Sequence, residues 1–469
     1  MSLIVSGYLP GGPDALVIFG AGRVADWSTE IELANPSDQE QFGTIATVTT
    51  PNQLEDCPGS CIDHPYRLPP NGTTTVELEG DQGAPEFVGT YYVVPDAGGV
   101  LPVAAARALH SGVPSHSLPV YRLNTLLQSF VPNAFGESGA QVLLGARRSA
   151  VEHSNLLLSV LQPPGTVDRS SVPLRVEVLD GSGAIVGTHD YRLAFGESRV
   201  IGDVVGALGV ESLDLGQIRV TQTGGTNIVR AALATALDGG AVTVTAGTLP
   251  ELGPIPDPAF DSAVIVGAGA IGDWDTEILL GDSAHFATDN VLSTAIPVRE
   301  PACEEWVADS ATIAVTASGV TCLDPGSNLV FANAAGHAPE AAARIFDRID
   351  PRRSADLPVC LTRQLVGIDL VFPFEAGRQN LFLAEGSGDH DATAHVEVRN
   401  ADGEVVGSMD ERIPAGGHVV IADVLAAVGA ADSFVGQIDV SAIGDGYLRG
   451  ALATLGEDDR FVVTAGTNP

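Results

Sequence analysis

The chain has 469 residues, among them 59 Asp or Glu against 23 Arg and no Lys, which gives a formal net charge of −36 at pH 7. Affinity for nucleic acid rests mainly on Lys and Arg that neutralise phosphates, so this charge argues against nucleic acid as a partner. No stretch approaches the roughly 20 uninterrupted apolar residues that span a bilayer, and we therefore expect no direct membrane insertion.

The length suits three or four domains of about 100–150 residues each, and an internal repeat indicates their arrangement. Val17–Ile31 returns as Val264–Ile278, with Gly-Ala-Gly, Asp-Trp and Thr-Glu-Ile in register. Further on, Leu101–Arg107 corresponds to Ala338–Arg344, because both segments end in Ala-Ala-Ala-Arg. Self-similarity of this kind indicates a repeated structural unit, which we call repeat A.

A second repeat, B, follows each copy of A. Its matching segments are Val176–Val178 with Val396–Val398, Gly216–Ile218 with Gly436–Ile438, and Arg230–Thr235 with Arg449–Thr454. The order A-B-A-B predicts an internal duplication into four modules, at residues 1–113, 114–250, 251–353 and 354–469. The Pro-rich segment Leu249–Pro258 has the composition of a semi-rigid spacer between the two copies. We expect residues 1–250 to superpose on 251–469.

The local patterns predict β-structure. In repeat B, Arg175–Leu179 alternates polar and apolar residues, a Gly-rich turn follows, and Ala184–Thr188 resumes the pattern, which predicts a β-hairpin. Asp203 and Asp423 each precede one apolar turn and a Gly, which predicts a short capped helix. Short strands between Gly and Pro turns favour β-sandwiches. We therefore expect an all-β chain of four tandem β-sandwich modules, with less than about 15 % helix against the usual third.

Several features of repeat B are shared with a known class of protein. They are the hairpin with an Asp-Gly turn, the turn at Ala415–Gly417, the step Ile421–Val424, Gly436–Ile438 and the strand Arg449–Ala453. The pattern resembles the immunoglobulin-like repeats of bacterial secreted and surface proteins. The resemblance covers both B modules well and the A modules loosely. It implies a spacer, adhesion or matrix role, and it carries over no catalytic residue.

Four of the five cysteines lie at equivalent places in the two A modules: Cys57 and Cys61 in the first, Cys303 and Cys322 in the second. A metal site would want a Cys-x-x-Cys spacing or nearby His. The sequence therefore favours disulfides Cys57–Cys61 and Cys303–Cys322, with free thiols as the alternative. Cys360 takes the position of Tyr121 after a Leu-Pro-Val step, and we expect it to be a small buried residue.

The polar residues best kept between the copies form two candidate sites. They are Asp26, Trp27 and Glu30, and their counterparts Asp273, Trp274 and Glu277. Carboxylates beside a Trp could bind a sugar, because carbohydrate sites use an aromatic platform with acidic neighbours. The sequence favours another interpretation, in which each Trp covers the open end of a sandwich while Asp and Thr make local turn bonds.

Other candidate chemistry is weaker. His390 and His395 are interpreted as surface-loop residues, and no His set has the spacing of a metal site. The Gly-Ala-Gly segments lack the third Gly of a dinucleotide fingerprint, so they are expected to be turns. Acidic loops such as Gly386–Asp391 could hold Ca²⁺ weakly, although no complete Ca²⁺ loop pattern is met. We expect no cofactor and no structural metal.

Three functions remain open from the sequence. The first is a non-catalytic structural or adhesive protein, extracellular, periplasmic or on the cell surface, whose partner is a protein or glycan of the surface or matrix. The second is a carbohydrate-binding surface protein. The third, more distant, is a hydrolase whose site forms between modules. Because sandwich folds serve many functions, the fold alone does not decide among them.

Overall fold

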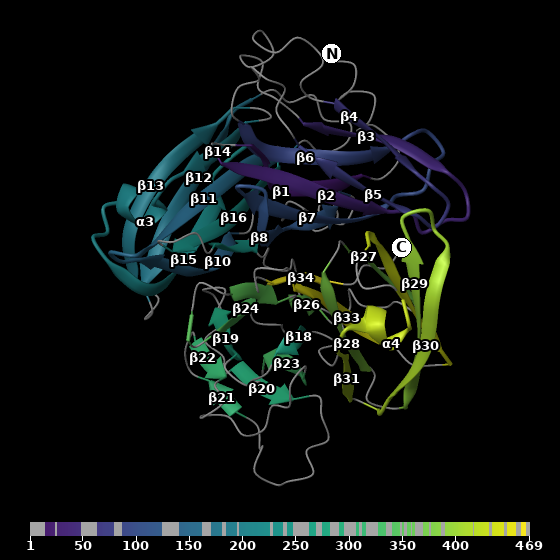
Figure 1. The fold of residues 1–469 in the computed structure, drawn as a ribbon. Helices are drawn as coiled ribbons and strands as arrows, with labels where there is room; N and C mark the ends of the chain where they lie inside the picture. The colour runs from purple at the N-terminus through teal and green to yellow at the C-terminus, as the bar shows by residue number, and fades with distance from the viewer. Residues whose placement is uncertain are drawn as a thin grey trace. The chain divides into compact units, whose positions relative to one another are not determined.

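The computed structural model of the chain consists almost entirely of antiparallel β-strands (Figure 1). Two helices have described bounds, α3 (Val204–Ala207) and α4 (Val424–Ala427), and each has four residues. The expectation of an all-β chain with little helix is confirmed. The structure describes residues 15–23, 26–47, 63–78, 87–123, 140–161, 170–180, 184–194, 197–225, 228–237, 242–246, 262–268, 274–281, 290–294, 306–308, 312–315, 327–333, 340–347, 349–350, 354–357, 359–361, 369–374, 377–385, 390–415, 417–430, 434–444, 448–455 and 461–465.

The first part of the chain forms two sheets, with strand orders β4-β3-β6-β1-β9 and β5-β2-β7-β8. Side chains buried completely come from both sheets, among them Ile18, Ile45, Ile31 and Leu33. The strands are β1 (Leu16–Arg23), β2 (Trp27–Ala34), β3 (Gln41–Thr47), β4 (Asp63–Leu68), β5 (Thr73–Glu77), β6 (Phe87–Pro95), β7 (Val103–His110), β8 (Val113–Leu118) and β9 (Val120–Arg122).

The next eight strands surround a second core. Their order is β13-β12-β15-β10-β11-β16-β17, with β14 on β11, and β10 joins β11 only through the pair Arg148–His153. We call the four strands β13-β12-β15-β10 outer sheet 1. The strands are β10 (Gln141–Arg148), β11 (Glu152–Leu161), β12 (Val172–Asp180), β13 (Ile185–Leu193), β14 (Ser198–Ile201), β15 (Leu213–Gln222), β16 (Ile228–Leu237) and β17 (Val242–Ala246).

The third group of strands again forms two sheets, β21-β20-β23-β18-β26 and β22-β19-β24-β25. Each order equals that of the first part of the chain when every strand number is raised by 17. The strands are β18 (Ser262–Ala268), β19 (Trp274–Gly281), β20 (Asn290–Thr294), β21 (Trp306–Ala308), β22 (Thr312–Val315), β23 (Ser327–Asn333), β24 (Glu340–Asp347), β25 (Ser354–Leu357) and β26 (Val359–Leu361).

The last group forms the sheets β27-β32-β29-β30 and β31-β28-β33-β34, which match the second group under the same shift. We call β30-β29-β32-β27 outer sheet 2. The strands are β27 (Asp369–Phe374), β28 (Arg378–Glu385), β29 (Ala392–Asn400), β30 (Val405–Ile413), β31 (His418–Ile421), β32 (Gly436–Ile443), β33 (Leu448–Leu455) and β34 (Phe461–Ala465).

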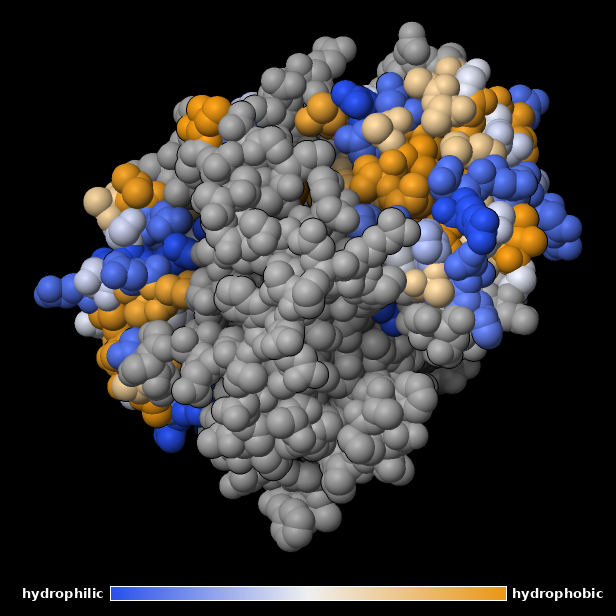
Figure 2. Space-filling view, turned by 90° about the horizontal axis from the view of Figure 1, so that it is seen from below, coloured by the Kyte–Doolittle hydropathy of each residue, from blue (hydrophilic) through white to orange (hydrophobic). Residues whose placement is uncertain are grey.

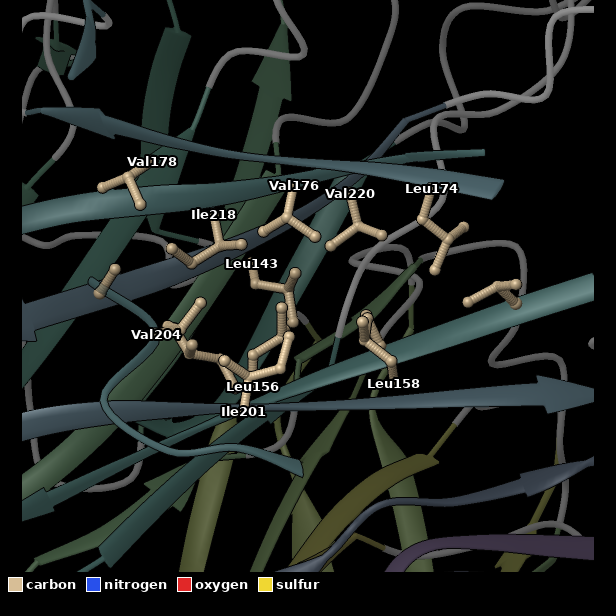
Figure 3. Packing of buried hydrophobic residues seen from close by; sticks show 14 of the residues in the cluster. Leu143, Leu156, Leu158, Leu174, Val176, Val178, Ile201, Val204, Ile218 and Val220 are labelled. Carbon is tan, nitrogen blue, oxygen red and sulfur yellow. The ribbon is translucent and has the colours of Figure 1, made fainter. Parts of the chain in front are cut away.

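Alternation of apolar and polar residues explains why these segments form two-layered packing. In β12 and β29 every second residue is buried, and a strand directs successive side chains to opposite faces. In Figure 3, Val176, Val178 and Ile218 of outer sheet 1 point toward Leu156 and Leu158 of β11. The equivalent core around Phe372 and Val396 has contributions from both sheets of the last group. Burial of the apolar faces stabilises each pair of layers.

The predicted hairpins and short helices of repeat B are confirmed. Strand β12 pairs with β13, and β29 with β30, as predicted. The side chains of Asp203 and Asp423 cap α3 and α4, accepting from Gly206 and Ala426. Both Asp residues adopt a left-handed conformation, with φ of 41° and 50°, instead of the β conformation usual for a cap. An Asn side chain accepts from the backbone N–H of each, at 2.9 and 3.0 Å.

The chain divides into two compact units. The first comprises residues 1–32, 40–68 and 74–253, and the second comprises 33–39, 69–73 and 254–469. In the first unit, a separate apolar cluster joins residues of β1 and β6 to Leu157 and Leu161 of β11. Strands β8 and β9 pair with β7 and β1, so these sheets continue past the predicted module boundary at 113/114. None of the helices in the described residues is long and apolar enough to cross a bilayer.

Candidate functional site

The aromatic member of the first candidate site, Trp27, begins β2 and is half-buried. Its indole stacks on the imidazole of His110, with ring centroids 4.6 Å apart and planes 29° apart. His116 lies beside it at 5.8 Å. Burial lowers the pKa of His116 to about 4, so this ring is neutral at ordinary pH and packs as an apolar group. The sequence analysis did not single out either His.

Glu30 belongs to a buried ion-pair cluster rather than to an open site. Arg107 on β7 donates through Nε to Glu30 at 2.5 Å and through Nη2 to Glu32 at 2.6 Å. The three side chains are only 7, 14 and 8 % exposed for Arg107, Glu30 and Glu32. A carboxylate held this closely by an internal guanidinium is oriented and desolvated already, which leaves it little capacity for a ligand.

The structure does not bring Trp27 and Glu30 together. Successive residues of a strand point to opposite faces, and positions 27 and 30 are an odd number of residues apart. His116, which lies near the Trp27 ring, is opposite Ala108 in the β7–β8 ladder. Arg107 precedes Ala108 and therefore points to the other face, where it meets Glu30. A sugar resting on the indole would not reach this carboxylate.

The polar neighbours of Trp27 form hydrogen bonds within the fold. The carbonyl of Asp26 accepts from the backbone N–H of Ser111 at 2.7 Å, and the Asp26 side chain is exposed. The hydroxyl of Thr29 accepts from the backbone N–H of Gly22 at 2.8 Å. This bond ties β1 to β2 and is buried. The buried Thr29 bond agrees with the structural interpretation, whereas the Asp26 bond is made by its backbone to a residue far along the chain and not within a local turn.

The second candidate site is described only in its backbone. Trp274 lies opposite Asp347, and Glu277 lies opposite Arg344, in the β19–β24 ladder. The Cζ atom of Arg344 lies 5.7 Å from the ring centre of Phe346. Asp273 and the side chains of Trp274 and Glu277 are outside the described residues. In this register Glu277 lies directly opposite Arg344. Their counterparts in the first copy, Glu30 and Arg107, form a salt bridge.

The predicted disulfides fall on segments that the structure does not describe. Cys57, Cys61, Cys303 and Cys322 all lie outside the described residues. The backbone of Cys360 lies in β26 opposite Val264, just as Tyr121 lies opposite Val17 in the first copy. The sequence equivalence of Cys360 with Tyr121 is therefore also an equivalence of strand register. The burial expected for the Cys360 side chain remains a prediction.

One histidine lies elsewhere than predicted. His395 is not a loop residue: it lies within β29, opposite Asp410 of β30, and its Nδ1 is 2.6 Å from Asp410 Oδ1. The hydrogen bond to Asp410 raises the pKa of His395 above its usual value. The alternation of polar and apolar residues in Ala392–Asn400 was the sequence signal that could have placed His395 in a strand. His390 is exposed in a bend. Within the described ranges, no group of three or more His, Cys, Asp or Glu is placed to hold a metal ion.

A buried arginine recurs in both copies of repeat B. Arg230 of β16 and Arg449 of β33 are both buried, and they occupy matching positions in the two sequences. Burial lowers the pKa of Arg230 to about 10, an effect that the nearby Tyr121 opposes. Burial in turn raises the pKa of Tyr121. Arg230 of β16 and Tyr121 of β9 are therefore close enough to influence each other electrostatically.

Comparison with known proteins adds little to these observations. No family model matches the chain, and no curated protein matches it. Among solved structures, the chain is similar to dimeric latent PorU from Porphyromonas gingivalis, with 12 % identity and a TM-score of 0.14. That match covers 70 % of this chain and 34 % of the other.

Proposed function

We propose that the protein is a non-catalytic structural or adhesive protein of the cell surface or extracellular space, built from two copies of a pair of β-sandwich modules. The observation that supports it best is the use of the conserved polar residues. Glu30 and Arg107 form a buried ion pair. Thr29 accepts a hydrogen bond from the backbone of Gly22, and Trp27 stacks on His110. Residues kept between the copies thus maintain the fold rather than line an open site.

The proposed duplication has a topological basis. The strand order of β1–β17 recurs in β18–β34, although the single eight-stranded sheet of β10–β17 corresponds to two four-stranded sheets in the second copy. The helix caps Asp203 and Asp423 recur with the same unusual backbone conformation and the same Asn partner. A tandem array of this kind suits a spacer, because each module contributes a core of its own and mainly sets distance. We propose a surface or matrix protein or glycan as its partner.

The proposed location can be tested on intact cells of the source organism. Antibodies against the folded protein should label cells that have not been permeabilised, and external protease should remove the label. Labelling that appears only after permeabilisation would overturn the extracellular or surface location. In parallel, alkylation of protein unfolded in urea without reductant should modify Cys360 but spare Cys57, Cys61, Cys303 and Cys322, as expected for exported protein with both disulfides.

Carbohydrate binding is the second candidate function, favoured by the partial exposure of Trp27 beside the exposed Asp26. A glycan array with wild type and with Trp27→Ala separates the two functions. On the structural proposal neither protein retains glycan, and Trp27→Ala lowers the free energy of unfolding by about 2–3 kcal/mol, less than for a fully buried ring. Specific glycan signal that only the wild type shows, with the variant stably folded, would place carbohydrate binding first.

A further inference from the structure

The net charge is distributed unevenly between the two copies of repeat B. Residues 114–250 contain 9 Arg and 11 Asp or Glu, a net charge of −2, whereas residues 354–469 contain 6 Arg and 18 Asp or Glu, a net charge of −12. Residues 1–113 and 251–353 each have a net charge of −11. An acidic macromolecule is therefore repelled by three of these segments and approaches the fourth at little electrostatic cost.

Three of the nine arginines of the nearly neutral segment lie on the solvent face of outer sheet 1. Alternation places Arg175, Arg192 and Arg219 on the face opposite the core, together with Glu177 and Asp190. Arg175 pairs with Asp190 at 2.9 Å, and Arg219 with Glu177 at 2.7 Å. Arg192 donates instead to the neutral hydroxyl of Ser171. These five ionic side chains leave the face with a charge of +1.

The matching face of outer sheet 2 has the opposite sign. His395, which lies opposite Asp410, replaces Arg175, and Asp439, which lies opposite Glu397, replaces Arg219. Arg412, the counterpart of Arg192, pairs with Asp391 where the first copy has Ser171. The ionic side chains of this face sum to −3 with His395 neutral, and they are Asp369, Asp391, Glu397, Arg399, Asp410, Arg412 and Asp439.

We propose that the solvent face of outer sheet 1 docks on outer sheet 2 of a second copy of this chain. The two faces share strand order and register, so both present a twisted sheet of the same shape with opposite charge. Each also exposes an aliphatic side chain at the same corner, Val186 or Val406. Figure 2 shows hydrophobic residues interleaved with hydrophilic ones on one face of the described surface. Because the two faces differ, the contact is heterologous and joins copies head to tail.

The geometry sets the strength of this contact. Val142 and Leu144 of β10 and Val371 of β27 are buried on this side, so only three strands of each sheet are available. Three strands spaced about 4.8 Å apart and about nine residues long offer roughly 430 Å² per partner, well below the ~800 Å² of a standard interface. We therefore expect weak association that requires the high local concentration of a surface layer or matrix. Salt affects self-association in two ways. Low salt leaves the long-range repulsion between two acidic chains unscreened, and very high salt weakens the ion pairs at the contact. At about 0.15 M the Debye length is about 8 Å, so contact pairs persist while distant charges are screened.

Sedimentation of the full chain at several concentrations tests the proposal, with a matched pair of variants. In wild type the average mass should rise with concentration at about 0.15 M salt and fall back at about 1 M. Arg192→Glu reverses a charge on the basic face and should weaken self-association at least tenfold. Arg412→Glu makes the same change at the equivalent position of the acidic face and should leave association equal or tighter. Circular dichroism checks that both variants keep their β-structure.

Two results would overturn the docking surface. One is a wild-type chain that stays monomeric at every salt and protein concentration. The other is equal weakening by both variants, which would show that the site of the charge does not matter. The inference rests on the proposed structural role but fails separately from it, because a monomeric chain can still be labelled on intact cells.

Discussion

The two copies of repeat B fill the same interior differently. Leu143 of β10 and Phe372 of β27 occupy equivalent positions, since each lies opposite the matching Ile in its ladder, Ile218 or Ile438. A second pair of equivalent positions is Ala231 in the first copy and Gly450 in the second. The first copy thus combines Leu143 with Ala231, and the second combines Phe372 with Gly450. A Cβ atom added at Gly450 would lie 2.7 Å from Phe372 Cζ. The larger ring and the smaller residue are thus coupled by packing.

The solvent faces of the same sheets carry different charged pairs in the two copies. Arg175–Asp190 of the first copy becomes His395–Asp410 of the second, in the same register. Glu177–Arg219 becomes Glu397–Asp439, two carboxylates directly opposite each other, and Arg399 contacts both, at 2.5 and 2.7 Å. Burial raises the pKa of Asp439 against the opposing effect of Arg399. The interior exchanges side-chain volume between two positions, whereas the solvent face exchanges charge, because Arg399 stands where the first copy has Leu179 and Asp439 stands where it has Arg219.

The largest effect is expected from emptying the core. Phe372→Ala should lower the free energy of unfolding by about 4 kcal/mol, because Phe372 is completely buried and its loss leaves a cavity. Leu143→Ala, at the equivalent place in the first copy, should cost about 3 kcal/mol. Urea unfolding of each variant measures both losses. A loss below about 1 kcal/mol for Phe372→Ala would mean that the second core does not depend on its largest residue.

A slightly smaller effect is expected at the ion-pair cluster of β2 and β7. Arg107→Met removes the guanidinium that both Glu30 and Glu32 contact and should cost about 3 kcal/mol, since two carboxylates stay in a buried environment. Glu32→Leu is the matched control, because Leu279 occupies this position in the second copy. The control should cost less than about 1 kcal/mol, as Arg107 keeps Glu30. Similar losses in both variants would contradict the central role of Arg107.

The coupling between the two cores can be tested directly. Gly450→Ala should cost about 2 kcal/mol, because the added methyl group meets the ring of Phe372. Combining it with Phe372→Leu recreates the Leu–Ala pair of the first copy, and the double variant should be more stable than Gly450→Ala alone. A double-mutant cycle in urea measures this interaction. Strictly additive losses would show that the two positions are independent.

The smallest effect is expected on the solvent face and depends on pH. The pKa of His395 is raised by Asp410, which lies opposite on β30, and by Glu397 on the same strand, while Ser441 of β32 is neutral. The pair's contribution is therefore fully present below the unfolded-state value of about 6.5 and is lost as pH rises through the folded-state pKa. It should stay below about 1 kcal/mol because the pair is largely exposed.

This pH dependence can be followed by NMR titration of His395 and by urea unfolding of His395→Ala between about pH 5 and 8. The matched control is Arg175→Ala, whose effect should not change over this range because Arg175 stays charged. If the destabilisation by His395→Ala grew with rising pH, the sign of the linkage would be wrong.

Sequence patterns predicted much of the local structure and some of the candidate site. Alternation in Arg175–Leu179 predicted the hairpin, and Asp203 before a single apolar turn predicted the helix. The repeat also marked Arg107 through its Ala-Ala-Ala-Arg segment, but without indicating a partner. The partners Glu30 and Glu32 lie on another strand, so only the pairing of β2 with β7 brings them to Arg107. The same holds for His110 and His116 beside Trp27.

The sequence by itself determined the all-β class, because the period of its apolar residues and its turn chemistry are local properties. Only the tertiary structure decided which strands pair and where sheets end. Strands β8 and β9 follow the Pro-rich signal near Pro114 yet complete the first two sheets, since β-ladders join segments far apart in sequence. Alternation along β2 alone places Trp27 and Glu30 on opposite sides of the strand. Only the tertiary structure decided what lies on each side, because His110, His116 and Arg107 come from other strands.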